Sequence, residues 1–154
     1  MHSTHVTKLL PYAPDELFAL VADVEAYPEF LPWVSSMRIW NRTAPQAGVR
    51  TLDAEAKVGF AFVRETFATR VRLDDAKRQI EVSLLYGPFK RLKNGWSFAP
   101  AEGGTRIEFD IDFAFKSRLL DALLSANLRQ AADRLIACFE SRAQTLYGAR
   151  ANAG

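Results

Sequence analysis

The strongest constraint on the fold is a strand pattern that runs directly into a long helix pattern near the C-terminus. Residues 105–115 alternate between apolar and polar types. Successive side chains of a strand point to opposite faces, so one face of this strand is apolar and the other is polar. The apolar face consists of Ile107, Phe109, Ile111, Phe113 and Phe115. This pattern predicts a sheet that packs one apolar face against the helix that follows.

The predicted helix begins after Ser117, a residue suited to cap a helix N-terminus, and ends at Gly148. Its apolar residues recur with a helical period. They form a stripe of Leu120, Leu124, Leu128, Ala131, Leu135, Cys138 or Phe139, Ala143 and Leu146. A helix of about 30 residues would be about 45 Å long, which exceeds the width of a typical sheet. We therefore expect a bend at residues 125–127.

Length and composition favour one domain over residues 1–148, followed by a disordered tail at residues 149–154. The 154 residues are 49% hydrophobic and 25% charged, with a formal net charge of +2, which suits one sizeable core. No apolar run approaches the roughly 20 residues that span a bilayer, and the N-terminus lacks a signal-peptide pattern. We expect a cytoplasmic protein. The single cysteine, Cys138, is expected to pack on the last helix instead of reacting.

The rest of the chain predicts two short helices and a series of strands. After a strand at residues 4–10, Pro14 and the acidic residues behind it suit a first helical turn, and the proline-punctuated segment 27–33 is too broken for a long helix. Further strand patterns lie at residues 36–42, 49–58, 63–73, 79–85 and 93–98. Strands without helices between them indicate an antiparallel sheet. The predicted class is α+β: a curved antiparallel sheet of about six or seven strands in a helix grip around a long C-terminal helix, with two short helices after the first strand.

Aromatic residues fall in the loops that would border the space between sheet and helix. They are Phe30, Trp33, Phe60, Phe62, Tyr86 and Phe89. A curved sheet wrapped around one helix tends to leave room between the two. Two interpretations stay open: these residues surround the mouth of a ligand cavity, or they are lids on an ordinary core.

Few residues suit catalysis or metal binding. The two histidines, His2 and His5, lie within the first five residues, so the expected cavity has no histidine base or metal ligand. We predict no catalytic residue, no metal site and no nucleotide-binding loop. A carboxylate site at Asp53 and Glu55, or at Glu65, is an alternative, but a solvated outer sheet face is the favoured interpretation.

Three sequence blocks, in order, resemble a known family. They are residues 27–33 (YPEFLPW), residues 87–92 (GPFKRL) with residues 96–98 (WSF), and residues 107–115 (IEFDIDFAF). They look like the conserved blocks of the coenzyme Q-binding START-like proteins, whose bacterial relatives include the ribosome-association toxins, within the polyketide cyclase and lipid-transport superfamily. The resemblance implies a START-like helix-grip fold with a hydrophobic tunnel that binds ubiquinone or a related prenyl lipid, supports respiration and needs no catalytic cofactor. Val34 departs from the pattern, because members often have cysteine at this point.

Expected tunnel residues come from the loops, the sheet and the last helix. They are Phe30, Leu31, Trp33, Phe62, Phe89, Trp96, Phe98, Phe109, Ile111, Phe113, Leu124, Leu128 and Leu135. Apolar burial would supply the affinity for a hydrophobic small-molecule ligand.

A basic cluster at Lys90, Arg91 and Lys93 directly follows Phe89. It predicts contact with anionic lipid at the inner membrane or with phosphates of the large ribosomal subunit. The simpler interpretation is that these charges only keep the end of a strand soluble. Mixed charges on the last helix argue against a DNA-binding stripe. The leading function is a quinone chaperone or carrier. The alternatives are a toxin-like ribosome-association protein and a polyketide cyclase or aromatase-like enzyme.

Overall fold

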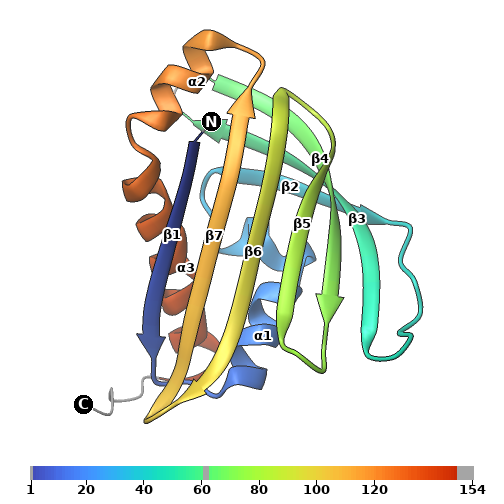
Figure 1. The fold of residues 1–154 in the computed structure, drawn as a ribbon, viewed down its shortest axis with the longest axis vertical. Helices are drawn as coiled ribbons and strands as arrows, with labels where there is room; N and C mark the ends of the chain where they lie inside the picture. Colours follow the sequence, from blue (N-terminus) through green and yellow to red (C-terminus); the bar gives the residue numbers. More distant parts are fainter. Residues whose placement is uncertain (1, 61–62, 149–154) are drawn as a thin grey trace.

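Seven antiparallel strands form one curved sheet in the computed structural model, which describes residues 2–60 and 63–148 (Figure 1). The strands are β1 (His2–Leu10), β2 (Val34–Trp40), β3 (Val49–Phe60), β4 (Val63–Asp74), β5 (Gln79–Tyr86), β6 (Phe89–Ala101) and β7 (Gly104–Phe115). Their order in the sheet is β1-β7-β6-β5-β4-β3-β2, so consecutive strands from β2 to β7 are neighbours and β1 closes the other edge. The predicted antiparallel sheet is confirmed. The tail at residues 149–154 and the predicted tunnel residue Phe62 lie outside the described residues.

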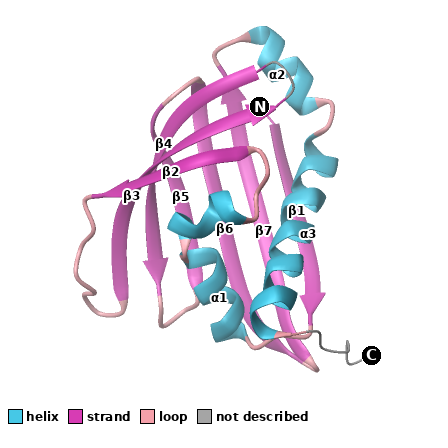
Figure 2. Ribbon diagram, turned by 180° about the vertical axis from the view of Figure 1, so that it is seen from behind, coloured by secondary structure: helices cyan, strands magenta, loops and turns pink. Residues whose placement is uncertain are grey.

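The helices all cover the same face of this sheet (Figure 2). They are α1 (Pro14–Ala22), the 3₁₀ helix η1 (Val24–Glu29), α2 (Arg118–Ser125) and α3 (Leu128–Tyr147). Pro14 begins α1 with its fixed φ, and the Glu16 carboxylate accepts a hydrogen bond of 2.9 Å from the N–H of Ala13. Pro28 lies inside η1 and keeps that helix short. The two short helices after the first strand are therefore confirmed.

The predicted 30-residue helix is divided into two, and the expected bend is confirmed. Ser117 caps α2 by accepting a hydrogen bond of 3.3 Å from the N–H of Leu120. At the break, the Asn127 side-chain amide donates to the carbonyl of Leu123 at 3.1 Å. This side-chain hydrogen bond takes one of the carbonyls at the end of α2, where the chain changes direction before α3 begins.

The predicted apolar stripe is confirmed only in part along α3, where Phe139 and Ala143 are buried as predicted and Leu128 and Leu135 are half-buried. The buried residues of α3 are Ala132, Ile136, Phe139 and Ala143. Ala131 is exposed and Leu146 is 50% exposed, although both belong to the predicted stripe. The sequence pattern assumes one continuous helix, whereas the break before α3 shifts the buried side by about one residue, so Ala132 and Ile136 are buried in place of Ala131 and Leu135.

Strand β6 is longer than the predicted strand at residues 93–98. It extends from Phe89 to Ala101 and pairs with β7 along its length. A register shift between Phe89 and Arg91 interrupts the alternation at its start. Because of this interruption, the first part of the strand does not alternate regularly, and the sequence pattern does not predict it.

Aromatic side chains form the centre of the core between the sheet, α1 and α3. The Trp96 ring lies 4.8 Å from Phe109 and 5.3 Å from Phe139, measured between ring centroids. Phe18 of α1 meets Phe98 of β6 edge to face at 6.0 Å. These residues are all at least 94% buried, so this half of the space between sheet and helices is closely packed.

Asp53 lies on the outer face of the sheet, as predicted, but it is not solvated. It is 3% exposed, because Arg70 of β4 donates two hydrogen bonds to it at 2.9 and 3.2 Å and Asn41 donates a third at 3.0 Å. The hydrogen bond from Arg70 lowers the pKa of Asp53, with burial acting in the opposite direction. A buried carboxylate held by three hydrogen bonds in this way is typical of a structural ion pair within the sheet.

Candidate functional site

The burial of side chains on the inner face of the sheet changes along the strands. Near α1 the inward residues Leu73, Ile80 and Ile107 are at most 2% exposed. Toward the other end, where α2 lies, several inward residues are only half-buried, among them Phe67 and Ile111. The α2 end of the molecule is also where β3 and β4 are joined and where β5 turns into β6 (Figure 1). The inner face is therefore less completely covered at this end than near α1.

An apolar pocket of about 90 Å³ lies between α2 and the sheet at the α2 end. Its lining residues come from β3, β4, β7 and α2: Val58, Val63, Glu65, Phe115, Leu120, Leu123 and Leu124. Six of these seven side chains are hydrocarbon, and α2 contributes three of them. No residue of α2 is buried, and Leu119 is 68% exposed. Helix α2 is therefore an apolar cover that is only loosely packed on the sheet.

One carboxylate connects α2 to the sheet. Asp121 accepts a hydrogen bond of 3.0 Å from the backbone N–H of Phe115 and lies 2.6 Å from Nε2 of His2. The hydrogen bond to His2 and then the one from Phe115 lower the pKa of Asp121. Although His2 is remote from α2 in the sequence, the β1–β7 pairing brings it to the α2 end, opposite Phe113. It is not among the residues that line the pocket.

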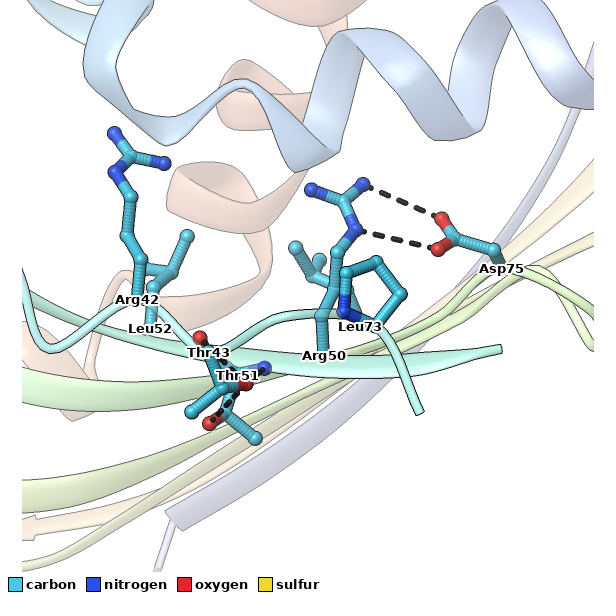
Figure 3. Close-up of a pocket in the computed structure, with 8 residues that line it drawn as sticks. Arg42, Thr43, Arg50, Thr51, Leu52, Leu73 and Asp75 are labelled. Atoms are coloured by element: carbon cyan, nitrogen blue, oxygen red, sulfur yellow. Dashed lines mark hydrogen bonds and ion pairs between the residues drawn. The ribbon is translucent and has the colours of Figure 1, made fainter. Parts of the chain in front are cut away.

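A larger, polar pocket of about 420 Å³ lies at the opposite end of β3 and β4 (Figure 3). Arg50 donates two hydrogen bonds to the Asp75 carboxylate at 3.2 and 3.3 Å, and Arg42 pairs with Glu25 of η1 at 3.0 Å. The threonine hydroxyls of residues 43 and 51 add further polar groups to its wall. An apolar chain in this pocket would displace water from charged and hydroxyl groups without offering them hydrogen bonds, so the pocket does not suit a lipid tail.

The predicted tunnel residues occupy two different environments. Leu31, Trp96, Phe98, Phe109 and Phe113 are buried in packed regions. Phe30, Trp33, Phe89, Ile111, Leu124, Leu128 and Leu135 are half-buried. Of the whole predicted set within the described residues, Leu124 alone lines the apolar pocket.

Of the other six pocket residues, Glu65 was considered only as part of an alternative carboxylate site, and the remaining five were not predicted as site residues. Phe115 and Leu120 belong to the apolar patterns of the last strand and helix, so alternation and period already placed them on inward faces. Val58, Val63 and Glu65 come from β3 and β4, and Leu123 from α2. No local signal marks these residues as the lining of an apolar pocket, because the pocket forms only when α2 folds over the β3–β4 end of the sheet.

The prediction that Glu65 lies on a solvated outer face is wrong. Strand β4 alternates so that Val63, Glu65 and Phe67 are half-buried while Arg64 and Thr66 are exposed. Glu65 pairs in register with Val58, which also lines the pocket. Residues directly opposite each other on paired strands share a face, so Glu65 belongs to the inner face. Glu55 does lie on the outer face, where it pairs with Arg38 and Tyr86.

The basic cluster at Lys90, Arg91 and Lys93 is exposed on β6. Arg91 forms an ion pair of 3.0 Å with Asp112 of β7, and Lys93 lies opposite the same carboxylate in register. Asp112 thus offsets part of the positive charge. What remains is a modest basic surface and not a dense patch.

Two further observations limit the kinds of site that the described residues offer. None of the described helices is both long enough and apolar enough to cross a bilayer. Residues 2–60 and 63–148 also contain no group of three or more histidine, cysteine, aspartate or glutamate side chains placed to hold a metal ion. Cys138 is half-buried on α3, as predicted.

The curved sheet, the short helices behind β1 and the C-terminal helix together define a START-like helix-grip fold. A START superfamily protein from Mycobacterium smegmatis has the same fold, with a TM-score of 0.80, 21% sequence identity and coverage of 95% of this chain and 99% of that chain. Residues 10–140 match the family model described as polyketide cyclase / dehydrase and lipid transport. The chain belongs to this family, and the resemblance identified from the three sequence blocks is confirmed.

Proteins with similar sequences carry different functional names. The ribosome association toxin RatA of Escherichia coli K12 is 35% identical over 145 residues, which cover 94% of this chain and 88% of the relative. The mitochondrial coenzyme Q-binding protein coq10 of Schizosaccharomyces pombe is 32% identical over 115 residues, covering 73% and 69%. The solution structure of the 18 kDa protein CC1736 from Caulobacter crescentus is 64% identical, with a TM-score of 0.82 and coverage of 97% and 100%.

Proposed function

We propose that this protein binds ubiquinone or a related prenyl lipid at the α2 end of the sheet and acts as a quinone chaperone or carrier that supports respiration. The observation that carries the proposal is the apolar pocket between α2 and the sheet, with its six hydrocarbon side chains. The similarity to a coenzyme Q-binding protein supports the choice of ligand. Apolar burial contributes about 25 cal/mol per Å² removed from water, so a prenyl tail needs no charged partner to bind.

The volume of the pocket bears on how such a ligand enters. At about 90 Å³, the pocket is well below the roughly 300–1,000 Å³ typical of small-molecule sites. A prenyl tail would therefore enter by moving α2 away from the sheet. No α2 residue is buried, so the movement would expose little core, and the hydrogen bonds of Asp121 to Phe115 and His2 are the contacts it would have to break. The half-buried residues Ile111, Leu128 and Leu135 would then extend the apolar surface offered to the tail.

The proposal places the protein in the cytoplasm, at times peripheral to the inner membrane, because a prenyl lipid has to be collected from a bilayer. Exposed Leu119 on α2 and the nearby cations Lys116 and Arg118 would suit such an encounter. The proposal includes no reaction. Among the seven pocket residues Glu65 is the one ionisable group, and none is a nucleophile of the serine, threonine or cysteine type.

The direct test is extraction of the purified protein with organic solvent, followed by mass spectrometry. We expect a quinone or another prenyl lipid to co-purify from a respiring host, and we expect added quinone to raise the melting temperature, because a ligand that binds only the native state stabilises it. Repeated preparations without lipid, together with an unchanged melting temperature and unchanged tryptophan fluorescence on adding quinone, would contradict the proposal.

Association with the large ribosomal subunit is a second candidate function. It is supported by the similarity to ribosome association toxins over 94% of the chain and by the exposed cations of β6. Contacts between cations and RNA phosphates weaken steeply with salt, because binding releases counterions. We expect co-sedimentation with large subunits to be weak, to fall as salt is added, and to be lost when Lys90, Arg91 and Lys93 become glutamate.

The triple variant also separates the two functions. An uncharged ligand in an apolar pocket is insensitive to these charges, so quinone binding should stay within about twofold of the wild type. A control with the same net charge reverses three scattered, exposed cations, Lys57, Lys77 and Arg106. If this control loses ribosome association as fully as the β6 variant, the effect is one of net charge and the β6 surface is not the contact.

A further inference from the structure

The polar pocket at the end of β3 and β4, away from α2, has no part in the proposed function. Its volume of about 420 Å³ lies within the roughly 300–1,000 Å³ typical of small-molecule sites. Arg50 lies directly opposite the fully buried Leu73, so this arginine belongs to the inner face of the sheet. Figure 3 shows the Arg42 and Arg50 side chains on the same side of the strands, extending toward the helices. Two guanidinium groups therefore line one pocket of ligand size.

Neither guanidinium group uses all of its donors on the protein. Within residues 2–60 and 63–148, Arg42 donates one hydrogen bond, to Glu25, and Arg50 donates two, both to Asp75. A guanidinium group has more N–H donors than these bonds require. The side chains of Arg42 and Glu25 are 56% and 66% exposed, and an ion pair as exposed as this contributes little to stability. An anion in the pocket can therefore take the place of Glu25 at Arg42 with little loss.

The two connections that frame the pocket hold an uncommon backbone conformation. The described non-glycine residues with positive φ are Asn41 (56°), Ala47 (54°) and Arg78 (52°). All of them lie in the β2–β3 loop or in the β4–β5 turn. The N–H of Asp75 joins these two segments by donating to the carbonyl of Gly48 at 2.8 Å. Left-handed conformations of residues such as alanine cost free energy and cluster at ligand-binding segments. The backbone around the pocket is therefore fixed before a ligand arrives.

We propose that this pocket binds a small phosphate ester that also carries hydroxyl groups, such as a sugar phosphate. Arginine suits a phosphate, because its N–H groups form charge-assisted hydrogen bonds to the phosphate oxygens. The phosphate binds Arg42 in place of Glu25, and Arg50 adds a second positive charge to the same wall. Each Asp75 oxygen accepts one hydrogen bond from Arg50 and has a further lone pair for a ligand hydroxyl. This inference does not depend on lipid binding, since the two pockets lie at opposite ends of β3 and β4.

The test is calorimetric titration of the full chain with ribose 5-phosphate. Arg42→Gln should weaken binding by about tenfold or more, because the variant loses the charged donor. Glu25→Gln should tighten binding by about threefold, since it removes the carboxylate that competes for Arg42. The matched controls are Arg106→Gln on β7 and Glu102→Gln in the β6–β7 turn, which make the same changes of net charge at exposed positions. Both controls should bind within about twofold of the wild type, because distant exposed charges are screened.

A comparison of ligands tests the two halves of the site separately. Inorganic phosphate should bind more weakly than ribose 5-phosphate, and ribose without phosphate should not bind. Equal binding of the two phosphates would contradict the role of Asp75. If neither phosphate binds, or if Arg106→Gln loses binding as fully as Arg42→Gln, the proposal is wrong and the arginines of the pocket form structural ion pairs only. The melting temperature of Arg42→Gln should stay close to the wild type, since the ion pair that it loses is exposed.

Discussion

Replacing Phe109 with alanine is expected to lower the free energy of unfolding by about 3–5 kcal/mol, the range for a fully buried phenylalanine. Phe109 is 2% exposed and contacts Trp96, its cross-strand partner on β6, at a ring distance of 4.8 Å. Its removal leaves a cavity in the packed half of the molecule, where α3 and the sheet hold the surroundings in place. Urea denaturation followed by tryptophan fluorescence measures the change.

Phe115 provides a matched control, because it lies on the same strand and the same inward face as Phe109 but lines the apolar pocket. It is half-buried and stacks on Phe89 at 4.5 Å. Phe115→Ala should cost less than half as much stability, because space already adjoins the side chain. Equal losses for the two variants would mean that the α2 end is packed as tightly as the rest and would count against a ligand site there.

Replacing Leu124 with tryptophan should weaken prenyl-lipid binding by at least tenfold and change the free energy of unfolding by less than about 1 kcal/mol. Empty volume beside a loosely packed helix accepts the larger side chain, whereas a close-packed core rejects it at a cost of about 1–3 kcal/mol. Leu124 lines the pocket and is half-buried. Calorimetric titration with a short-tailed ubiquinone gives the affinity, and thermal unfolding gives the stability.

Leu119→Trp is the control for this substitution. Leu119 belongs to the same helix but is 68% exposed and does not line the pocket. The Leu119 variant should bind as the wild type does. Unchanged binding by the Leu124 variant would place the ligand away from α2, and an unfolded Leu124 variant would indicate a solid core at this end.

The sequence alone was sufficient to predict the order and type of the elements. Alternation at residues 105–115 marks β7, the helical period marks the C-terminal helices, and Pro14 marks the start of α1. These are local signals, because a period of two or of 3.6 residues and the fixed φ of proline act within a few residues of chain. The three sequence blocks added the family, which the comparisons then confirmed.

Only the tertiary structure decided which part of the inner face is packed and which is open. Phe109 and Phe115 carry the same signal in the sequence, yet one is buried against Trp96 and the other lines a pocket. The difference depends on which helix covers each phenylalanine, α3 or the loosely packed α2. The break at residues 126–127 and contacts between distant segments decide this. The burial of Ala132 and Ile136 on α3, in place of Ala131 and Leu135, depends on the same break.

The face of Glu65 was likewise decided by pairing between strands. A charged residue in an alternating strand is ordinarily assigned to the outer face, and this expectation holds for Glu55. For Glu65 the register with Val58 places the residue on the inner face, where part of its side chain lines the same pocket as three leucines that lie 55 or more positions further along the chain. The sequence therefore determined the fold of this protein, and the position of α2 over the β3–β4 end of the sheet determined its candidate site.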